Sequence, residues 1–195
     1  LYESKAGERG IFSRVASQKQ AAKNGRRDAN YAFGTNPCSE IVLRGPKLDK
    51  NGHPIPNTGG QFCNLSEVVV RPEDTIEELK WKVRLATILG TLQATLTDFR
   101  YLRGIWKKNT EEEALLGVSL TGIMDNSLMT LENPRLPELL EELRHEAIKT
   151  NKEWAKRLGI KQSAAITCVK PSGTVSQLVD SASGIHPRYS QYYIR

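Results

Sequence analysis

The sequence predicts an α/β protein that is rich in helices. Two short apolar runs, residues 40–44 and 61–70, flank a stretch rich in Gly and Pro and are typical of strands. Longer stretches in the second half carry apolar residues at helical spacing, and the run AAITCV at 164–169 predicts a further short strand. At 195 residues the chain can bury one sizeable core. We therefore expect one domain, residues 1–195, which is an incomplete part of a larger one.

Four helices are predicted from apolar spacing and from the residues that begin and end them. Ser13 is a suitable N-cap for the first helix, and Gly25 and Gly159 are suitable stops for the first and the last. From Leu85 to Leu96 the second helix is apolar on nearly all sides, which predicts burial inside something larger than this chain. The predicted helices cover residues 13–24, 75–96, 111–129 and 136–158.

The two N-terminal strands are expected to form a hairpin-like unit. Residues 45–60, GPKLDKNGHPIPNTGG, predict an exposed loop between the strands at 40–44 and 61–70. In that arrangement Cys38 lies on the turn before one strand and Cys63 lies on the other. The two thiols would then face the same pocket.

Composition and charge indicate the general class of the protein. The mean hydropathy is −0.46 and no apolar run approaches the ~20 residues that span a bilayer, so we expect a soluble protein with no membrane partner. Three cysteines fit a reducing cytoplasm. The net charge is +6, and residues 1–44 carry eight Lys or Arg against four Asp or Glu. Such an excess can attract nucleic acid or a phosphorylated ligand, although a solvated basic face is the simpler interpretation.

The stretch FGTNPCSEIVLR, residues 33–44, is the strongest local signal of chemistry. Asn36, Cys38 and Glu40 occupy alternate positions, and alternate side chains of an extended chain point the same way. Pro37 favours an extended Asn36, because the residue before proline avoids the α region. An amide, a thiol and a carboxylate on one face predict an active-site constellation.

The other cysteines and the histidines show no pattern of metal ligation, and the two cysteines differ in their sequence surroundings. Cys63 is flanked by Phe and Asn, unlike a typical core cysteine, whereas Cys168 lies in an apolar run and is expected to be a core residue. The three His have no metal-ligand spacing and there is no CxxC. We therefore expect no protein-bound metal.

A second motif, CVKPSGTVS at residues 168–176, predicts a strand that ends in a turn. The strand breaks at Pro171, and Ser172, Gly173 and Thr174 lead into a segment that can be helical. Such a turn can offer backbone N–H groups and hydroxyls to a phosphate. An ordinary strand-to-helix loop is the alternative, since turns of this kind are common.

Four motifs in order, NPCSE, QFCNLSEV, LLGVSLTGIMD and CVKPSGTVS, resemble the catalytic subunit of ribonucleotide reductases. The resemblance covers essentially the whole chain and is greatest to the adenosylcobalamin-dependent, class II enzymes. It implies that the chain is part of a ten-stranded α/β barrel with a finger loop, and that the cofactor is adenosylcobalamin.

The resemblance also implies residue roles in radical-based reduction of ribonucleotides. Cys38 would carry a transient thiyl radical that abstracts the ribose 3′ hydrogen, Glu40 would be the general base on the 3′ hydroxyl, and Asn36 would bind the substrate hydroxyls. Cys63 would be one half of a redox-active pair, whose other half is expected upstream. The residues that would bind the substrate phosphates are Pro171, Ser172, Gly173, Thr174, Val175 and Ser176.

The implied partners are a ribonucleoside di- or triphosphate, a thioredoxin-like reductant and the remainder of the same polypeptide, with no direct contact to nucleic acid. Because the second redox cysteine is absent from the chain, we expect it to be inactive alone. Two alternatives stay open. One is the large subunit of a class I reductase, whose radical comes from a separate metalloprotein. The other is a nucleotide-binding module that is not an enzyme.

Overall fold

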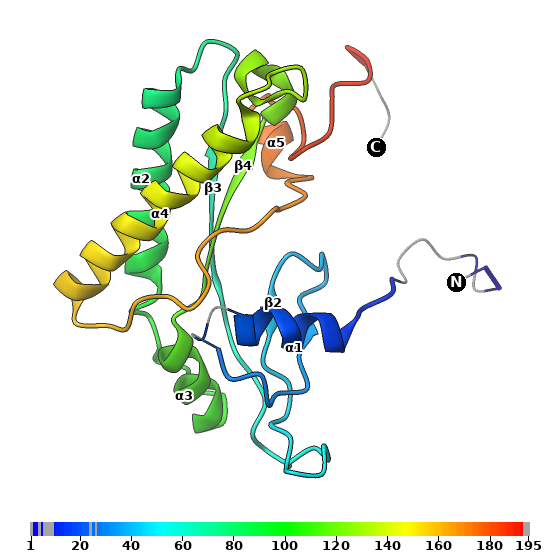
Figure 1. Cartoon of the computed structure of the whole chain (residues 1–195), viewed down its shortest axis with the longest axis vertical. Helices are drawn as coiled ribbons and strands as arrows, with labels where there is room; N and C mark the ends of the chain where they lie inside the picture. The colour runs from blue at the N-terminus through cyan, green and yellow to red at the C-terminus, as the bar shows by residue number, and fades with distance from the viewer. Residues whose placement is uncertain (1, 4, 6–9, 24, 26, 193–195) are drawn as a thin grey trace.

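The computed structural model describes residues 2–3, 5, 10–23, 25 and 27–192, whose arrangement Figure 1 shows. The predicted α/β class is confirmed, and the described residues form two small sheets rather than a closed barrel. In chain order the elements are α1 Arg14–Lys23, β1 Gly34–Thr35, β2 Val42–Leu43, β3 Asn64–Val69, α2 Ile76–Gln93, α3 Gly104–Glu113, β4 Leu116–Thr121, two 3-10 turns at Ile123–Asp125 and Ser127–Met129, α4 Leu136–Leu158 and α5 Val175–Leu178.

The larger sheet is parallel and has β4 at its centre. β3 pairs with β4 from Asn64 opposite Leu116 to Val69 opposite Thr121. Along the other edge of β4 runs the segment 165–168, which hydrogen-bonds to the backbone of β4 and forms one parallel bridge. The predicted strand at 164–169 is therefore present as an extended segment that pairs only locally.

Alternate residues of β4 face two different environments, as the period of a strand requires. Leu116 and Val118 point to the face that α2 and α4 cover (Figure 1), where they join the main hydrophobic core. Gly117 points to the opposite face, and a Cβ there would lie 2.4 Å from a methyl carbon of Leu65 and 3.0 Å from the sulfur of Cys168. Glycine at this position therefore allows β3 and the 165–168 segment to approach closely on the side where two cysteines lie.

The smaller sheet belongs to an N-terminal unit that lies beside the lower half of β3 in Figure 1. β1 and β2 pair antiparallel, with Thr35 opposite Val42. Tyr31 and Phe33 are buried against Ala21 of α1 and form a separate small core. The unit thus carries the stretch 33–44 on a compact support of its own.

The predicted hairpin between residues 40–44 and 61–70 is wrong. β2 pairs with β1 and β3 pairs with β4. Near Arg44 the two predicted segments approach each other without forming a ladder: Gly60 N–H donates to the Arg44 carbonyl, and Arg44 N–H donates to the side-chain carbonyl of Gln61. A buried parallel strand such as β3 needs partners from far along the chain, so nearness in sequence is a poor guide to its pairing.

The predicted helix at 111–129 is also wrong. α3 ends at Glu113 because Ala114 adopts a left-handed conformation, and the apolar run that follows is β4. Short apolar runs that are buried on both faces cannot be told from helix by periodicity alone. Two glycines of this run have structural roles: Gly117 allows neighbouring strands to approach closely, and Gly122 adopts a left-handed conformation in the turn after β4.

The other three predicted helices are confirmed, with shifts of a few residues at the ends. Ser13 caps α1, whose expected last residue, Asn24, lies outside the described residues. Thr75 and Glu78 form a reciprocal capping box at the start of α2. Gly159 ends α4 in the left-handed conformation.

One side of α2 is apolar and exposed in this chain, in agreement with the nearly all-round apolar composition noted above. The opposite side packs against β3 and α4 through Leu79 and Val83, which are buried. The exposed residues are Trp81, Leu85, Leu89, Leu92 and Leu96.

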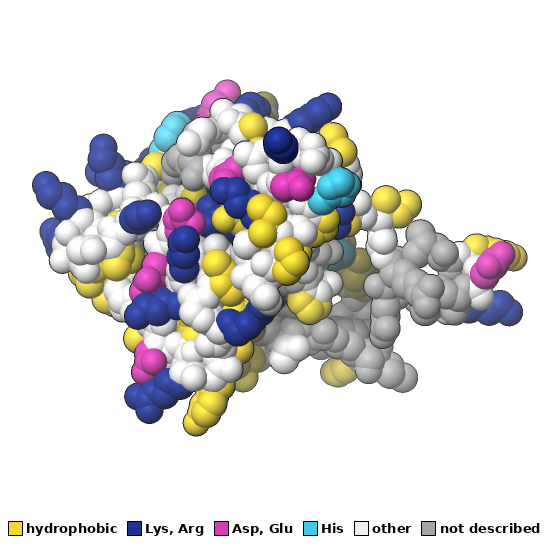
Figure 2. All heavy atoms as spheres, turned by 90° about the horizontal axis from the view of Figure 1, so that it is seen from below, with side chains coloured by type: hydrophobic (Ala, Val, Ile, Leu, Met, Phe, Trp, Pro, Cys, Tyr) yellow, Lys and Arg dark blue, Asp and Glu magenta, His cyan; other side chains and the backbone are white. Residues whose placement is uncertain are grey.

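Charged side chains are spread over the surface. Figure 2 shows Lys and Arg interleaved with acidic and hydrophobic side chains on one face, without a single continuous basic patch. In the described part of the chain, no helix combines the length and the apolar character needed to cross a bilayer.

Two leucines of α2 test this packing. Leu79 is 0% exposed, so Leu79→Ala leaves a cavity, and we expect the free energy of unfolding to fall by about 2–5 kcal/mol. Leu89 is 56% exposed, and Leu89→Ala in the same helix should cost less than about 1 kcal/mol. Urea denaturation followed by circular dichroism measures both. Equal losses for the two variants would contradict this orientation of α2.

Candidate functional site

The NPCSE stretch forms a turn that is fixed by its own asparagine. The backbone N–H of Ser39 donates to the Asn36 carbonyl at 3.0 Å, and the N–H of Ile41 donates to Asn36 Oδ1 at 3.0 Å. Ser39 has φ of 64°, a left-handed conformation that reverses the chain after Cys38. Ile41, which is buried, anchors the end of the turn. The site therefore begins with a turn whose shape the Asn36 side chain maintains.

Part of the expected geometry of this stretch is correct and part is wrong. Cys38 lies on a turn before its strand, as predicted, and it is exposed. Asn36, Cys38 and Glu40 do not share one face of an extended chain, because the backbone reverses between Pro37 and Ser39. As a result Cys38 points to solvent, whereas the Glu40 side chain is buried.

Glu40 turns inward and meets a lysine from the other end of the chain. Its side chain is 1% exposed, and Lys170 Nζ lies 2.7 Å from Oε1. Burial opposes ionisation of this carboxyl, but hydrogen bonds from Lys170, from its own backbone N–H and from Asn36 outweigh burial and lower the pKa of Glu40. The second oxygen, Oε2, is buried and has no hydrogen-bond partner among the described residues. One oxygen is thus held by an ammonium group, while the other is buried without a hydrogen-bond partner among the described residues.

Cys63 and Cys168 lie on the same side of the sheet as Glu40. Both pack against a small core formed by Ile41, Leu115 and Ala164. Burial, with a further contribution from the Glu40 carboxylate, raises the pKa of Cys63, and the same two causes raise the pKa of Cys168 to about 12. Cys168 is half-buried, so the expected core position is reached only in part, and its raised pKa disfavours the reactive thiolate. Cys63 is half-buried and adjoins the carboxylate.

The turn at residues 171–176 is held by hydrogen bonds from Ser183 in the C-terminal segment. The Ser183 hydroxyl lies 3.0 Å from the Pro171 carbonyl and 3.2 Å from the Ser172 carbonyl. Ser172 has φ of 54°, and its buried hydroxyl has no hydrogen-bond partner in the described part of the chain. Thr174 is exposed and Ser176 is buried. The turn thus presents one orphaned hydroxyl and one exposed hydroxyl in a fixed backbone.

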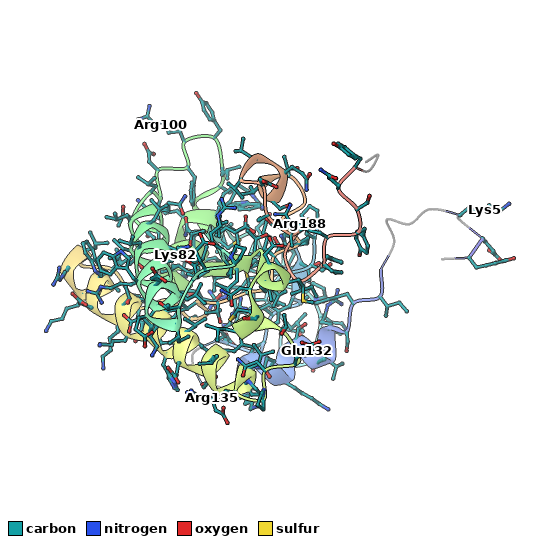
Figure 3. All side chains as sticks on the ribbon, turned by 90° about the horizontal axis from the view of Figure 1, so that it is seen from above. Lys5, Lys82, Arg100, Glu132, Arg135 and Arg188 are labelled. Atoms are coloured by element: carbon teal, nitrogen blue, oxygen red, sulfur yellow. The ribbon has the colours of Figure 1, made fainter. Side chains whose placement is uncertain are left out.

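A cavity of about 970 Å³ opens beside this turn. Gly173 and Ser176 line it together with the segment from Asp180 to Gln191. Arg188 borders the cavity next to α5 (Figure 3), and hydrogen bonds to Asp125 and Asp180 raise the pKa of its guanidinium. The cavity therefore combines small polar groups with a permanent positive charge.

The two cysteine-bearing segments are fastened to the end of α3 by a buried acidic residue. Glu113 is 1% exposed and forms ion pairs with Arg27 at 2.9 Å and with Arg44 at 3.2 Å. The side-chain amide of Gln61 donates to the same carboxylate at 2.6 Å, while its carbonyl accepts from the Arg44 N–H. Gln61 precedes Cys63 by two residues, and Arg44 follows Glu40 by four. The carboxylate of Glu113 thereby fixes these segments relative to each other.

The structure brings four of the ten predicted site residues, Asn36, Cys38, Glu40 and Cys63, into one region and adds Lys170 to them. Glu40 lies within electrostatic range of Cys63 and Cys168, and Lys170 lies within range of Cys38, so the thiols and the carboxylate share one region. Lys170 follows directly after the apolar run, at the end of a parallel edge segment, which is where functional side chains of parallel sheets gather. That position is a signal that sequence reasoning could have used. Of the 171–176 turn, Gly173 and Ser176 line a neighbouring cavity that holds none of the three thiols.

The described residues include no cluster of potential metal ligands. In the described ranges, no three His, Cys, Asp or Glu side chains lie together in a way that could hold a metal ion.

With this geometry in view, the chain can be compared with known proteins. It is 30% identical, over an alignment of 187 residues, to the adenosylcobalamin-dependent ribonucleoside-triphosphate reductase of Lactobacillus acidophilus, which covers 83% of this chain and 23% of that protein. It is 29% identical to the protein of the same name from Lacticaseibacillus paracasei, over 98% of this chain and 27% of the relative. No protein-family model matches the chain.

A solved structure agrees with these relatives. A B12-dependent, class II ribonucleotide reductase superposes on 80% of this chain with a TM-score of 0.61 and 27% sequence identity, and the match covers 23% of that structure. This chain is a relative of the adenosylcobalamin-dependent ribonucleotide reductases. The resemblance seen in the four motifs is therefore confirmed, including its preference for class II. The chain spans about a quarter of the length of these reductases.

The three cysteines should react with iodoacetamide in a definite order at pH 8. The thiolate is the reactive form, so the exposed Cys38 should be alkylated first, Cys63 more slowly, and Cys168 slowest because its pKa is raised to about 12. Peptide mass spectrometry at successive times measures the three rates. In 8 M urea, as the control, the rates should converge. Native labelling of Cys168 as fast as that of Cys38 would contradict the described burial.

Proposed function

We propose that this chain is part of the catalytic subunit of an adenosylcobalamin-dependent ribonucleotide reductase and provides the radical half of its active site. One observation carries the proposal. The buried carboxylate of Glu40 has one oxygen held by Lys170 and the other without a hydrogen-bond partner among the described residues, and it lies beside the half-buried thiol of Cys63. The exposed thiol of Cys38 lies two residues before Glu40, on a turn. Relatives that carry this activity by name support it.

The residue roles follow from what each group can do. The Cys38 thiol, exposed on its turn, would lose its hydrogen to become the thiyl radical that removes the 3′ hydrogen of the ribose. Glu40, ionised and with Oε2 not engaged by any described residue, would accept the proton of the 3′ hydroxyl and so favour loss of the 2′ hydroxyl. Asn36 would keep the turn in shape and bind substrate hydroxyls. Cys63 would be one thiol of the pair that supplies two electrons and becomes a disulfide.

The cofactor would supply the chemistry that side chains lack, which is the reversible formation of an organic radical. The feature of this chain that fits such a group is the exposed position of Cys38, because a thiol must be reachable to give up its hydrogen atom. We assign no residue of the chain to holding the cofactor.

The 171–176 turn would bind the substrate phosphates. The buried hydroxyl of Ser172, unpartnered among the described residues, and the exposed Thr174 support this role, whereas the guanidinium of Arg188 in the neighbouring cavity is already paired with Asp125 and Asp180. Gly173 and Ser176 line that cavity, and Pro171 and Val175 complete the turn. The relatives are triphosphate reductases by name, so we propose a ribonucleoside triphosphate as the substrate.

The rest of the catalytic barrel would come from the remainder of the same polypeptide. In the described part of the chain no strand pairs with the outer edge of β3, and one face of α2 is apolar and exposed. Both surfaces suit further strands and helices of a ten-stranded barrel. A thioredoxin-like protein in the cytoplasm would renew the dithiol, and the products would be deoxyribonucleotides for DNA synthesis.

The two alternatives have less support. A class I reductase subunit would share the motifs, but the relatives are named as adenosylcobalamin-dependent. A nucleotide-binding module leaves the buried pairing of Glu40 with Lys170 next to Cys63 without a purpose, and the basic side chains on the face in Figure 2 are scattered.

Cysteine variants of the complete protein test the proposal. With adenosylcobalamin, a ribonucleoside triphosphate and a dithiol reductant, Cys38→Ser should abolish both turnover and radical formation, because serine cannot form a comparably stable radical. Cys63→Ser should still form the radical but fail after the first turnover with a protein reductant. Product analysis and electron paramagnetic resonance measure the two steps, with Cys168→Ser as the matched control that retains activity. Failure of both variants at the same step would contradict the division of roles, and activity without cobalamin would favour class I.

A further inference from the structure

We infer that Lys170 is a positioning residue for Glu40: its ammonium group holds Oε1 of the buried carboxylate, keeps that carboxylate ionised and oriented, and thereby links the 171–176 turn to the thiol-bearing turn. The inference rests on the proposed function for its meaning in catalysis, whereas the contact itself is a property of the folded chain. Lys170 lies within the CVKPSGTVS motif, directly before the 171–176 turn.

The backbone of Lys170 is fixed on both sides. Its N–H donates to the hydroxyl of Ser119, a residue of β4, at 2.9 Å. On the other side the chain passes so close to Gly184 that a Cβ there would lie 2.8 Å from the Lys170 carbonyl oxygen. Gly184 has φ of +57°, so glycine is favoured for conformational reasons as well. The position of the lysine is thus determined by β4 and by the C-terminal segment, independently of Glu40.

Glu40 is fixed separately, at the end of a turn that Asn36 closes and Ile41 anchors. The ion pair therefore joins two rigid supports that lie 130 residues apart in sequence. The Glu40 side chain is 1% exposed and that of Lys170 is 30% exposed, so the acid is shielded from water while the ammonium group reaches the surface of the site. A carboxylate buried in this way needs such a partner to stay charged.

The charges around the pair come from every segment that meets there. Lys170 is the cation that faces Glu40, and hydrogen bonding to Glu40 raises the pKa of Lys170 in turn. The two charges of the pair have opposite effects on Cys63, which directly precedes β3. The Glu40 carboxylate raises the pKa of Cys63, and the Lys170 ammonium group lowers it. The titratable groups that meet the pair are Cys38 on the turn, Cys63 before β3, Cys168 beside β4 and, through Cys168, Glu67 of β3.

This arrangement predicts two effects of Lys170→Met. Without the ammonium group the pKa of Glu40 rises, so a reaction that needs the carboxylate loses rate at low pH, and the acidic limb of the kcat/KM profile moves to higher pH. The Cys63 thiolate also loses a favourable charge. Its alkylation at pH 8 should therefore slow by a factor of roughly three to ten relative to the unmodified chain.

The experiment measures iodoacetamide labelling of Cys63 by mass spectrometry and, on the complete protein, kcat/KM against pH. Lys170→Arg keeps the positive charge and should restore the labelling rate and most of the pH profile. Glu40→Gln removes the opposing charge and should speed labelling of Cys63. Lys152→Met removes an exposed lysine of α4 and serves as the control, with no expected change in either quantity.

The outcomes separate this inference from the proposed function. Slower labelling in Lys170→Met, rescue by Lys170→Arg and a shifted acidic limb support a positioning role. Labelling of Cys63 that is unchanged in Lys170→Met, or equally slowed in Lys170→Arg, overturns it. Absence of cobalamin-dependent reduction by the unmodified complete protein defeats the proposed function, while the labelling rates still decide whether Lys170 controls the charge of the site.

Discussion

The structure depends on one buried carboxylate. Glu113, at the last position of α3, accepts two arginines and the amide of Gln61 at a place where its side chain is 1% exposed. A charge buried to this degree is tolerated only when it is paired and hydrogen-bonded, and removing one partner leaves an uncompensated ion. Arg44 also bonds to Glu112 at 2.5 Å and lies over the ring of Tyr31, so the N-terminal unit is locked to the sheet at this point. Without that lock, the turn that bears Cys38 would have no fixed relation to β3.

The functional geometry is built outward from this lock in two steps. The segment that precedes Arg44 and the segment that follows Gln61 bring Glu40 and Cys63 to one face of the parallel sheet, where Gly117 makes room for close packing. The segment on the other edge of β4 then places the ammonium group of Lys170 next to Oε1 of Glu40. Catalytic sites of parallel sheets commonly lie at the carboxyl ends of the strands. Here the site instead combines a loop that enters from the N-terminal unit with the end of an edge segment, which suits a finger loop that reaches into a barrel.

Sequence reasoning predicted the local features and missed the long-range ones. The α4 boundaries, the caps at Ser13 and Gly159 and the turn at Cys38 depend on neighbouring residues and could be predicted. The hairpin was wrong because the partners of β2 and β3 are chosen by burial against distant segments. β4 was taken for helix because an apolar run buried on both faces has no useful periodicity. For the candidate site, Asn36, Cys38, Glu40 and Cys63 can be proposed from their residue types, while the contact of Lys170 with Glu40, across 130 residues, leaves no trace in spacing.

The most direct test of the central role of Glu113 is a double-mutant cycle with Arg44. The free energy of unfolding is measured by urea denaturation for Glu113→Gln, Arg44→Met and the double variant. Each single change should cost about 3–5 kcal/mol, because it leaves a buried partner uncompensated. The double variant should cost less than the sum of the two by at least about 1 kcal/mol, since the second change removes the orphaned charge. Additive losses within about 0.5 kcal/mol would show that the two residues act independently and would contradict this account.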